Sequence, residues 1–191
     1  MLALAGCSRE PEPVLPFTET LPLEFGLLDP LILLSKVDAD EWRGGSVTSH
    51  PPDTALTDLG RAMAVSERIA LLPVGNANAI VIRKSEGLSW VITGPKLSLV
   101  EFESWRNVNL EPVISSAIAD ATPTDKPPLT WKLASDGLIV LAAHHSFLKD
   151  ALNASEIALK AGEYVITQKQ FTSPDGAFKG YVYEFNSVAS K

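Results

Sequence analysis

The sequence predicts an α+β fold, a single domain with a mostly antiparallel sheet and two or three short helices. Short apolar or β-favouring runs recur along the chain, separated by Gly, Asn, Asp and Pro residues that are typical of turns. In contrast, few stretches place apolar side chains at helical spacing. The chain has 191 residues, of which 46% are hydrophobic and 20% charged, so it can bury one sizeable core.

The first half of the domain contains one helix signal among strand signals. The apolar run 31–34 predicts a strand in the middle of a sheet. Asp53 follows two prolines and can cap a helix, in which apolar residues at helical spacing share one face. The apolar runs 69–72 and 79–82 flank Gly75-Asn76-Ala77-Asn78 and predict a hairpin. Two further strands are expected at 88–92 and 97–102.

The second half continues the pattern with one more helix. An apolar stripe with helical spacing predicts a helix over 112–121. The turn signal Asp136-Gly137 predicts a hairpin between the runs 129–133 and 138–141. A last hairpin is expected to turn at 173–176, because the following aromatic residues alternate with others as in a half-buried strand.

The sequence predicts a lipoprotein signal remnant and a Pro-rich tether in residues 1–24. Residues 25–191 are expected to form the single domain. Leu4-Ala5-Gly6-Cys7 resembles the lipobox of bacterial lipoproteins, which implies a diacylglycerol on the thiol of Cys7. Two acyl chains give stable membrane anchoring. Ser8 after the cysteine resembles lipoproteins sent to the outer membrane. We therefore expect a lipid-anchored periplasmic protein, with a cytoplasmic one as the alternative if the four residues match by chance.

Charge and motifs argue against nucleic-acid binding and against catalysis. The net charge of −7 repels phosphate backbones. The sequence contains neither a Gly-x-Ser-x-Gly elbow nor a glycine-rich phosphate loop, so we expect neither catalytic residues nor a cofactor. His144 and His145 are adjacent and point to opposite faces of a strand, so we expect no metal site. The carboxylates of Glu101 and Glu103 could pair for acid–base chemistry, but alternation along a strand is more typical of a solvated face.

The run Glu41-Trp42-Arg43-Gly44-Gly45 is the strongest interface signal. A half-exposed Trp beside an Arg is a composition typical of binding hot spots, whereas the alternative is a Trp at the edge of the core. Trp90 and Trp131 lie inside strand patterns and are expected in the core.

Several of these motifs, in this order, resemble the immunity protein 21 family of bacterial polymorphic-toxin and type VI secretion systems. The early matches are Pro30-Leu31-Ile32-Leu33-Leu34, Trp42-Arg43-Gly44, Asp58 with Arg61-Ala62, and Ala70-Leu71-Leu72 before Ala79-Ile80-Val81. The later ones are Leu138-Ile139-Val140-Leu141 with Ala142-Ala143, and Leu159 before Gly162-Glu163-Tyr164-Val165.

The resemblance implies an antibacterial-toxin inhibitor that binds its cognate toxin and catalyses nothing. With a lipid anchor, the toxin would act on the cell envelope. We expect Trp42 and Arg43 to anchor the toxin, and acidic side chains to meet its basic groups. Those acidic residues are Asp38, Asp40, Asp53 and Asp58. The main alternative is an envelope lipoprotein that binds a ligand or an assembly partner, and a third reading is an envelope hydrolase with an unfamiliar site.

Overall fold

The computed structural model describes residues 30–45, 57–83, 87–93, 96–105, 110–146 and 154–188. Cys7, the tether at 1–24 and Asp53 lie outside these ranges. The helices are η1 (Lys36–Glu41, 3-10), α1 (Asp58–Met63) and α2 (Leu110–Asp120). The strands are β1 (Leu31–Ser35), β2 (Ile69–Val74), β3 (Ala77–Ile82), β4 (Gly87–Thr93), β5 (Lys96–Trp105), β6 (Thr122–Pro123), β7 (Leu129–Leu133), β8 (Leu138–Ala142), β9 (Ser155–Ile157), β10 (Gly162–Thr172) and β11 (Phe178–Ser187).

Five strands form the smaller of two antiparallel sheets, in the order β2-β3-β1-β8-β9. The predicted central position of 31–34 is confirmed, because β1 pairs with β3 on one side and with β8 on the other. All five residues of β1 are buried, as expected for a strand with a layer on each face. The predicted hairpin at Gly75 is also confirmed, as the turn between β2 and β3.

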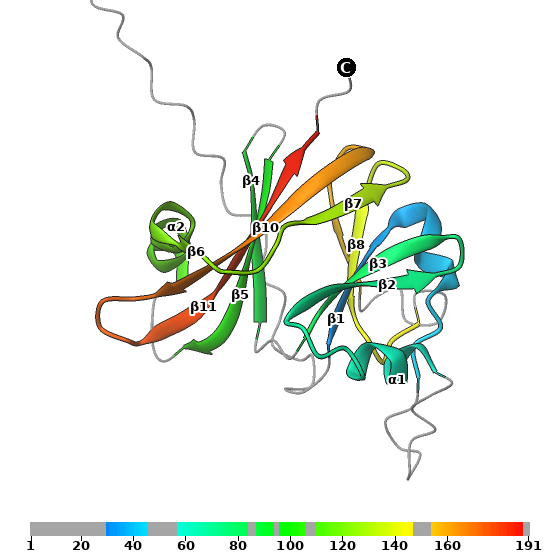
Figure 1. Cartoon of the computed structure of the whole chain (residues 1–191), viewed down its shortest axis with the longest axis horizontal. Helices are drawn as coiled ribbons and strands as arrows, with labels where there is room; N and C mark the ends of the chain where they lie inside the picture. Colours follow the sequence, from blue (N-terminus) through cyan, green and yellow to red (C-terminus); the bar gives the residue numbers. More distant parts are fainter. Residues whose placement is uncertain are drawn as a thin grey trace, which may run out of the picture.

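Six strands form the larger sheet, in the order β4-β5-β11-β10-β6, with β7 also paired to β10 (Figure 1). The predicted last hairpin is confirmed as β10 and β11, which pair from Tyr164↔Ser187 to Thr172↔Lys179. Every strand pairing is antiparallel. The α+β class predicted by the sequence is therefore confirmed, with two sheets in place of one.

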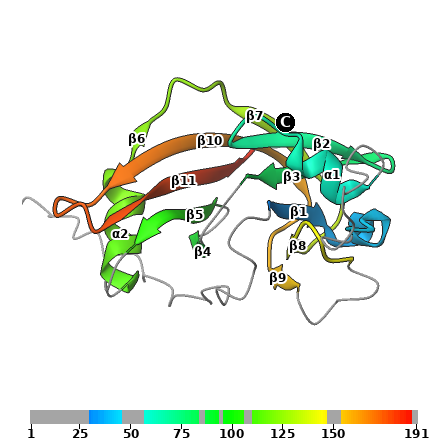
Figure 2. The same ribbon diagram turned by 90° about the horizontal axis from the view of Figure 1, so that it is seen from below.

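Along the long axis of the molecule, η1 and α1 are followed by the smaller sheet, the larger sheet and α2 (Figures 1 and 2). One face of the smaller sheet packs against η1 and α1 through Ala39, Trp42, Leu59 and Ala62. Its other face packs against the larger sheet. The far face of the larger sheet packs against α2 through Ile114 and Ala117. The short helices thus cover opposite ends of the stack.

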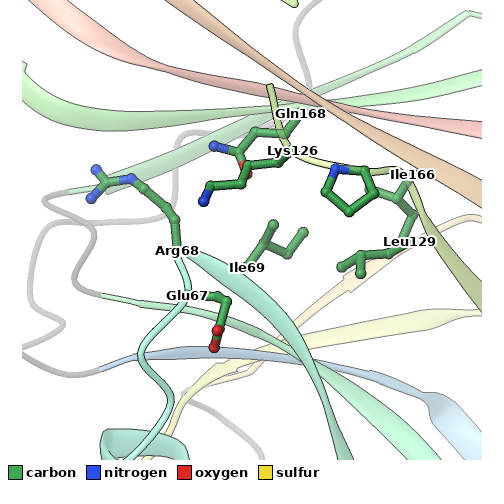
Figure 3. Close-up of a pocket in the computed structure, with 8 residues that line it drawn as sticks. Glu67, Arg68, Ile69, Lys126, Leu129, Ile166 and Gln168 are labelled. Carbon is green, nitrogen blue, oxygen red and sulfur yellow. The ribbon is translucent and has the colours of Figure 1, made fainter. Parts of the chain in front are cut away.

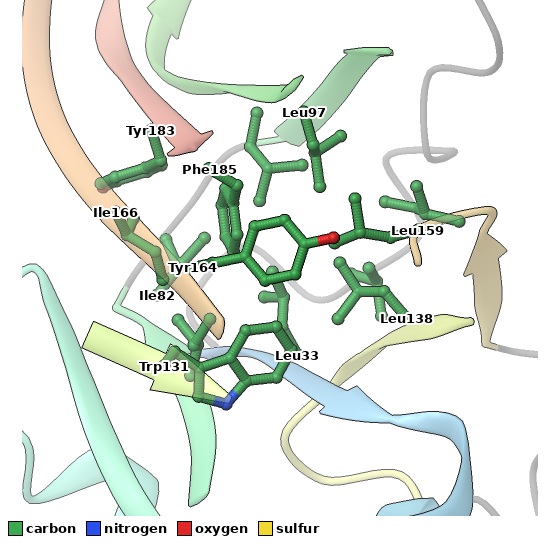
Figure 4. Packing of buried hydrophobic residues seen from close by; sticks show 14 of the residues in the cluster. Leu33, Ile82, Leu97, Trp131, Leu138, Leu159, Tyr164, Ile166, Tyr183 and Phe185 are labelled. Carbon is green, nitrogen blue, oxygen red and sulfur yellow. The ribbon is translucent and has the colours of Figure 1, made fainter. Parts of the chain in front are cut away.

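The core between the sheets is aromatic at its centre (Figure 4). Trp131 stands edge-on to Phe185, with ring centroids 6.3 Å apart, and its indole N–H donates to the Asn78 carbonyl at 2.7 Å. The hydroxyl of Tyr164 donates to the Lys160 carbonyl at 2.6 Å. These bonds satisfy the polar ends of buried rings, so the aromatic groups are held in place between the sheets. The predicted core position of Trp131 is confirmed.

Two local predictions are wrong. The runs 129–133 and 138–141 do not form a hairpin, because β7 pairs with β10 in the larger sheet and β8 pairs with β1 in the smaller one. The chain crosses between sheets at this turn, where the Ser35 hydroxyl accepts the backbone N–H of Ser135 at 3.0 Å. The first helix is capped by Thr57, whose hydroxyl accepts the Gly60 N–H at 3.1 Å, and not by Asp53. In the ranges described above, no helix has the length and apolar character needed to cross a bilayer.

Candidate functional site

The outward side of η1 and α1 carries most of the residues that the sequence predicted to bind a partner. In a 3-10 helix, side chains three residues apart align. Ala39 and Trp42 therefore both face the smaller sheet. Asp40 and Glu41 are exposed and Asp38 is half-buried. We call this surface, formed by η1, Arg43 and α1, the η1–α1 face.

η1 carries three carboxylates, and the charges of two of them, Asp38 and Glu41, repel each other. Burial raises the pKa of Asp38, and the nearby charge of Glu41 raises it further. No Lys or Arg in the described ranges forms an ion pair with Asp38, Asp40 or Glu41. Beside them, Val37 is 63% exposed. The face therefore combines carboxylates that form no ion pair within the described residues with an exposed apolar side chain, as binding surfaces often do.

Asp58 and Arg43 connect η1 to α1. The Asp58 carboxylate accepts the backbone N–H of Arg43 at 2.9 Å and the Arg61 guanidinium at 3.0 Å. Arg61 also donates to the Pro73 carbonyl. Asp58 is thus largely engaged within the chain and positions this face, whereas the side chain of exposed Arg43 is left on the surface.

The expected exposure of Trp42 is wrong, because its side chain is fully buried. It packs between η1 and the smaller sheet, and its indole N–H donates to the Ala143 carbonyl at 3.1 Å. Gly44 follows with a φ of +65°, pressed against the backbone carbonyls of His144 and His145, where only glycine fits. Trp42 therefore offers no surface to a partner. The three-residue spacing of Ala39 and Trp42 is the signal that could have indicated this.

The rings of His144 and His145 lie against each other, with centroids 3.9 Å apart and planes inclined by 42°, and both residues are half-buried. The backbone carbonyl of His144 accepts the N–H of Gly45 at 3.2 Å. The pair thus packs against the segment that follows Trp42. Among the residues that the structure describes, no group of three His, Cys, Asp or Glu side chains could hold a metal ion.

Sequence reasoning missed a buried ionic group between the sheets. Glu101 on β5 is fully buried, against the prediction of a solvated face. It forms an ion pair with Arg68 at 3.0 Å and accepts a hydrogen bond from the hydroxyl of Tyr183. Burial raises the pKa of Tyr183 well above its usual value, and the Glu101 charge adds to this, so the phenol stays protonated and donates. The sequence around Glu101 does not indicate that it is buried, because its partners are distant in sequence. Tyr183 belongs to β11, and Arg68 directly precedes β2.

Arg68 also lies over the ring of Tyr181, 4.3 Å from its centroid. Arg68 is also one of the residues that line a small cavity of about 110 Å³ (Figure 3). Its walls combine the aliphatic side chains of Ile69, Leu129 and Ile166 with charged and amide groups. The cavity is large enough for one aliphatic side chain or a small ligand.

No family model matches this chain, and neither a curated protein nor a solved structure matches it.

Proposed function

We propose that this protein is an immunity protein, which binds a cognate bacterial toxin at the η1–α1 face and neutralises it without catalysing a reaction. The observation that carries the proposal is the acidic surface of η1, where burial and the charge of Glu41 raise the pKa of Asp38. A basic partner would lower that pKa and relieve the repulsion. The resemblance of the sequence motifs to the immunity protein 21 family points to a toxin as this partner.

The toxin surface is expected to be basic with a shallow apolar hollow. Its cations would meet Asp38, Asp40 and Glu41, and the hollow would take Val37, which is 63% exposed. Arg43 would contact the rim of the complex. The net charge of −7 would speed the encounter with such a partner and discriminate against acidic proteins.

The proposed compartment is the periplasm, with the protein anchored to the outer membrane through a lipid on Cys7. The lipobox-like run at 4–7 and the Pro-rich segment after it support this location. Mass spectrometry of protein extracted from membranes of cells that carry the full gene is expected to find an acylated Cys7 at the N-terminus. A soluble protein without acyl chains would contradict the anchor and favour the cytoplasm.

Growth of toxin-producing cells tests the function. We expect the gene next to this one to encode a product that kills when exported to the periplasm, and co-expression of this chain to restore growth. Asp40→Lys should weaken the complex by about 2 kcal/mol, roughly 30-fold, because it sets a cation against basic groups of the toxin. The variant should protect poorly at equal expression.

Asp125→Lys is the matched control, since it makes the same change of charge at an exposed aspartate before β7. It should protect as well as the wild type. Equal protection by the two variants would remove the η1–α1 face from the proposal. Death of cells that express the wild-type chain fully would overturn the immunity function itself.

A second function is favoured by the cavity beside Arg68. In this alternative, the chain is an envelope lipoprotein that binds a ligand or an assembly partner. The aliphatic walls and the charged rim of Lys126, Glu67 and Arg68 suit a small amphiphilic group. A ligand that co-purifies and is displaced by filling the cavity with Leu129→Trp would support it over toxin binding.

A further inference from the structure

A groove separates α2 from the end of β10 and from the turn that follows it. Two adjoining hollows of about 510 and 370 Å³ form it, and they share Ser116, Phe171 and Pro174. We call it the α2–β10 groove. It lies on the far side of the larger sheet, at the opposite end of the molecule from the η1–α1 face (Figures 1 and 2).

The groove has an apolar floor and an acidic rim. Phe171 is 8% exposed and packs on Phe178, with ring centroids 5.7 Å apart. This packing holds the ring of Phe171 in place at the bottom of the groove. Pro174 and Val113 extend this apolar surface. Asp120 stands at the end of α2, and Asp175 stands on the turn. No lysine or arginine is among the lining residues of either hollow.

Asp175 is held in its charged form. Its carboxylate accepts hydrogen bonds from the Ser173 hydroxyl at 2.5 Å and from the Ala177 N–H at 3.0 Å. These bonds lower the pKa of Asp175, the hydroxyl contributing most. Asp175 therefore keeps its negative charge at neutral pH, and its hydrogen bonds within the turn fix the position of its carboxylate.

The groove also follows an open edge of the larger sheet. β6 pairs with β10 only at Lys169 and Gln170. Within the described part of the chain, no strand pairs with Phe171 or Thr172 on the side away from β11. Both residues line the groove. An extended segment lying there could place main-chain groups against this edge and side chains on the Phe171 floor, as in β-strand addition.

We propose that the α2–β10 groove binds an extended, basic segment of a protein partner. Alternate side chains of the segment would be apolar and rest on Phe171 and Pro174, while lysines or arginines would reach Asp120 and Asp175. Ser116 lines both hollows. Because this groove and the η1–α1 face lie at opposite ends, the chain can hold this partner and the toxin at the same time.

A labelled peptide tests the proposal. The probe is a short fluorescein-labelled peptide in which lysine and valine alternate, and its control has glutamate in place of lysine. Fluorescence anisotropy with the full chain is expected to show saturable binding of the lysine peptide, at least about tenfold tighter than that of the glutamate peptide. Ser116→Arg, which fills the groove and adds a cation, should weaken binding about tenfold or more.

Two further variants distinguish binding in the groove from general electrostatic attraction of a basic peptide to an acidic protein. The double variant Asp120→Asn/Asp175→Asn should weaken binding of the lysine peptide about tenfold. Asp125→Asn is the control, because it also removes an exposed carboxylate but lies outside the groove. It should change the affinity less than about twofold. In an NMR titration, the amide signals of Phe171 and Thr172 should shift most. Equal binding of both peptides, or an unchanged affinity in Ser116→Arg, would overturn the proposal. Neither result bears on the toxin complex, which uses the other face.

Discussion

Replacing Trp42 by alanine is expected to lower the free energy of unfolding by about 4 kcal/mol, which is typical of a large aromatic side chain removed from a core. The indole is fully buried between η1 and the smaller sheet, and its N–H donates to the Ala143 carbonyl at 3.1 Å. Its loss leaves a cavity and a buried carbonyl without this donor. Urea denaturation followed by circular dichroism measures the effect.

Trp42→Phe is the control for this prediction. Phenylalanine keeps most of the packing and loses the indole donor, so it should cost about 1–2 kcal/mol. A cost below about 1 kcal/mol for Trp42→Ala, together with loss of partner binding, would mean that Trp42 is an exposed contact after all. If Trp42 is structural, Trp42→Phe should bind a partner as well as the wild type does.

Replacing Glu101 by alanine is expected to cost about 3 kcal/mol. The variant leaves Arg68 without its buried partner and the Tyr183 hydroxyl without its acceptor. Removal of one member of a buried ion pair is destabilising because the remaining charge stays poorly solvated. The side chain of Arg68 is 23% exposed and contacts Tyr181, so water and the ring offset part of the loss. The measurement is again the unfolding free energy in urea.

A double variant tests the cause. In Glu101→Leu/Arg68→Met no unpaired charge remains, and apolar groups fill the space between the sheets, so stability should recover by about 2 kcal/mol relative to Glu101→Ala. Glu101→Gln should fall between the wild type and Glu101→Ala, since its amide oxygen can still accept the Tyr183 hydroxyl. Equal stability of Glu101→Ala and the wild type would show that the ion pair does not join the sheets.

Local signals in the sequence predicted the positions of the strands and turns better than they predicted which strands pair. The turn signals at Gly75 and at 173–176 lie between strands that do pair. Asp136-Gly137 marks a reversal equally well, but there the chain leaves one sheet for the other. What decides the pairing is distant in sequence: Trp131 bonds to Asn78 and packs on Phe185. A turn motif holds no information about such contacts.

The residues of the candidate site could also be predicted only in part, because contacts distant in sequence decide which of them are exposed. Asp38, Asp40 and Arg43 lie on one face, as their closeness in sequence suggests, and Asp58 joins them through the Arg43 backbone. The charged neighbours of Trp42 suggested exposure, whereas its three-residue spacing from Ala39 indicates the buried side of η1. Glu101 sits on the inner face of a strand that has polar residues on both faces, so alternation suggested solvent. It is buried in an ion pair with Arg68, which directly precedes β2 of the smaller sheet.

We propose that the two surfaces, at opposite ends of the molecule, bind different partners. The η1–α1 face covers the smaller sheet and presents carboxylates that a basic toxin would neutralise, while α2 and the edge of β10 form a groove at the other end. The buried Glu101–Arg68 pair and the aromatic core hold the two sheets together.

Titration of the purified toxin with the purified chain tests the central claim most directly. The toxin is the product of the neighbouring gene, and its activity is followed while the chain is added. If the chain is an immunity protein, activity falls to the background at an equimolar ratio, and Asp40→Lys shifts the titration to higher concentration while Asp125→Lys does not. Full toxin activity in the presence of excess wild-type chain would contradict the account.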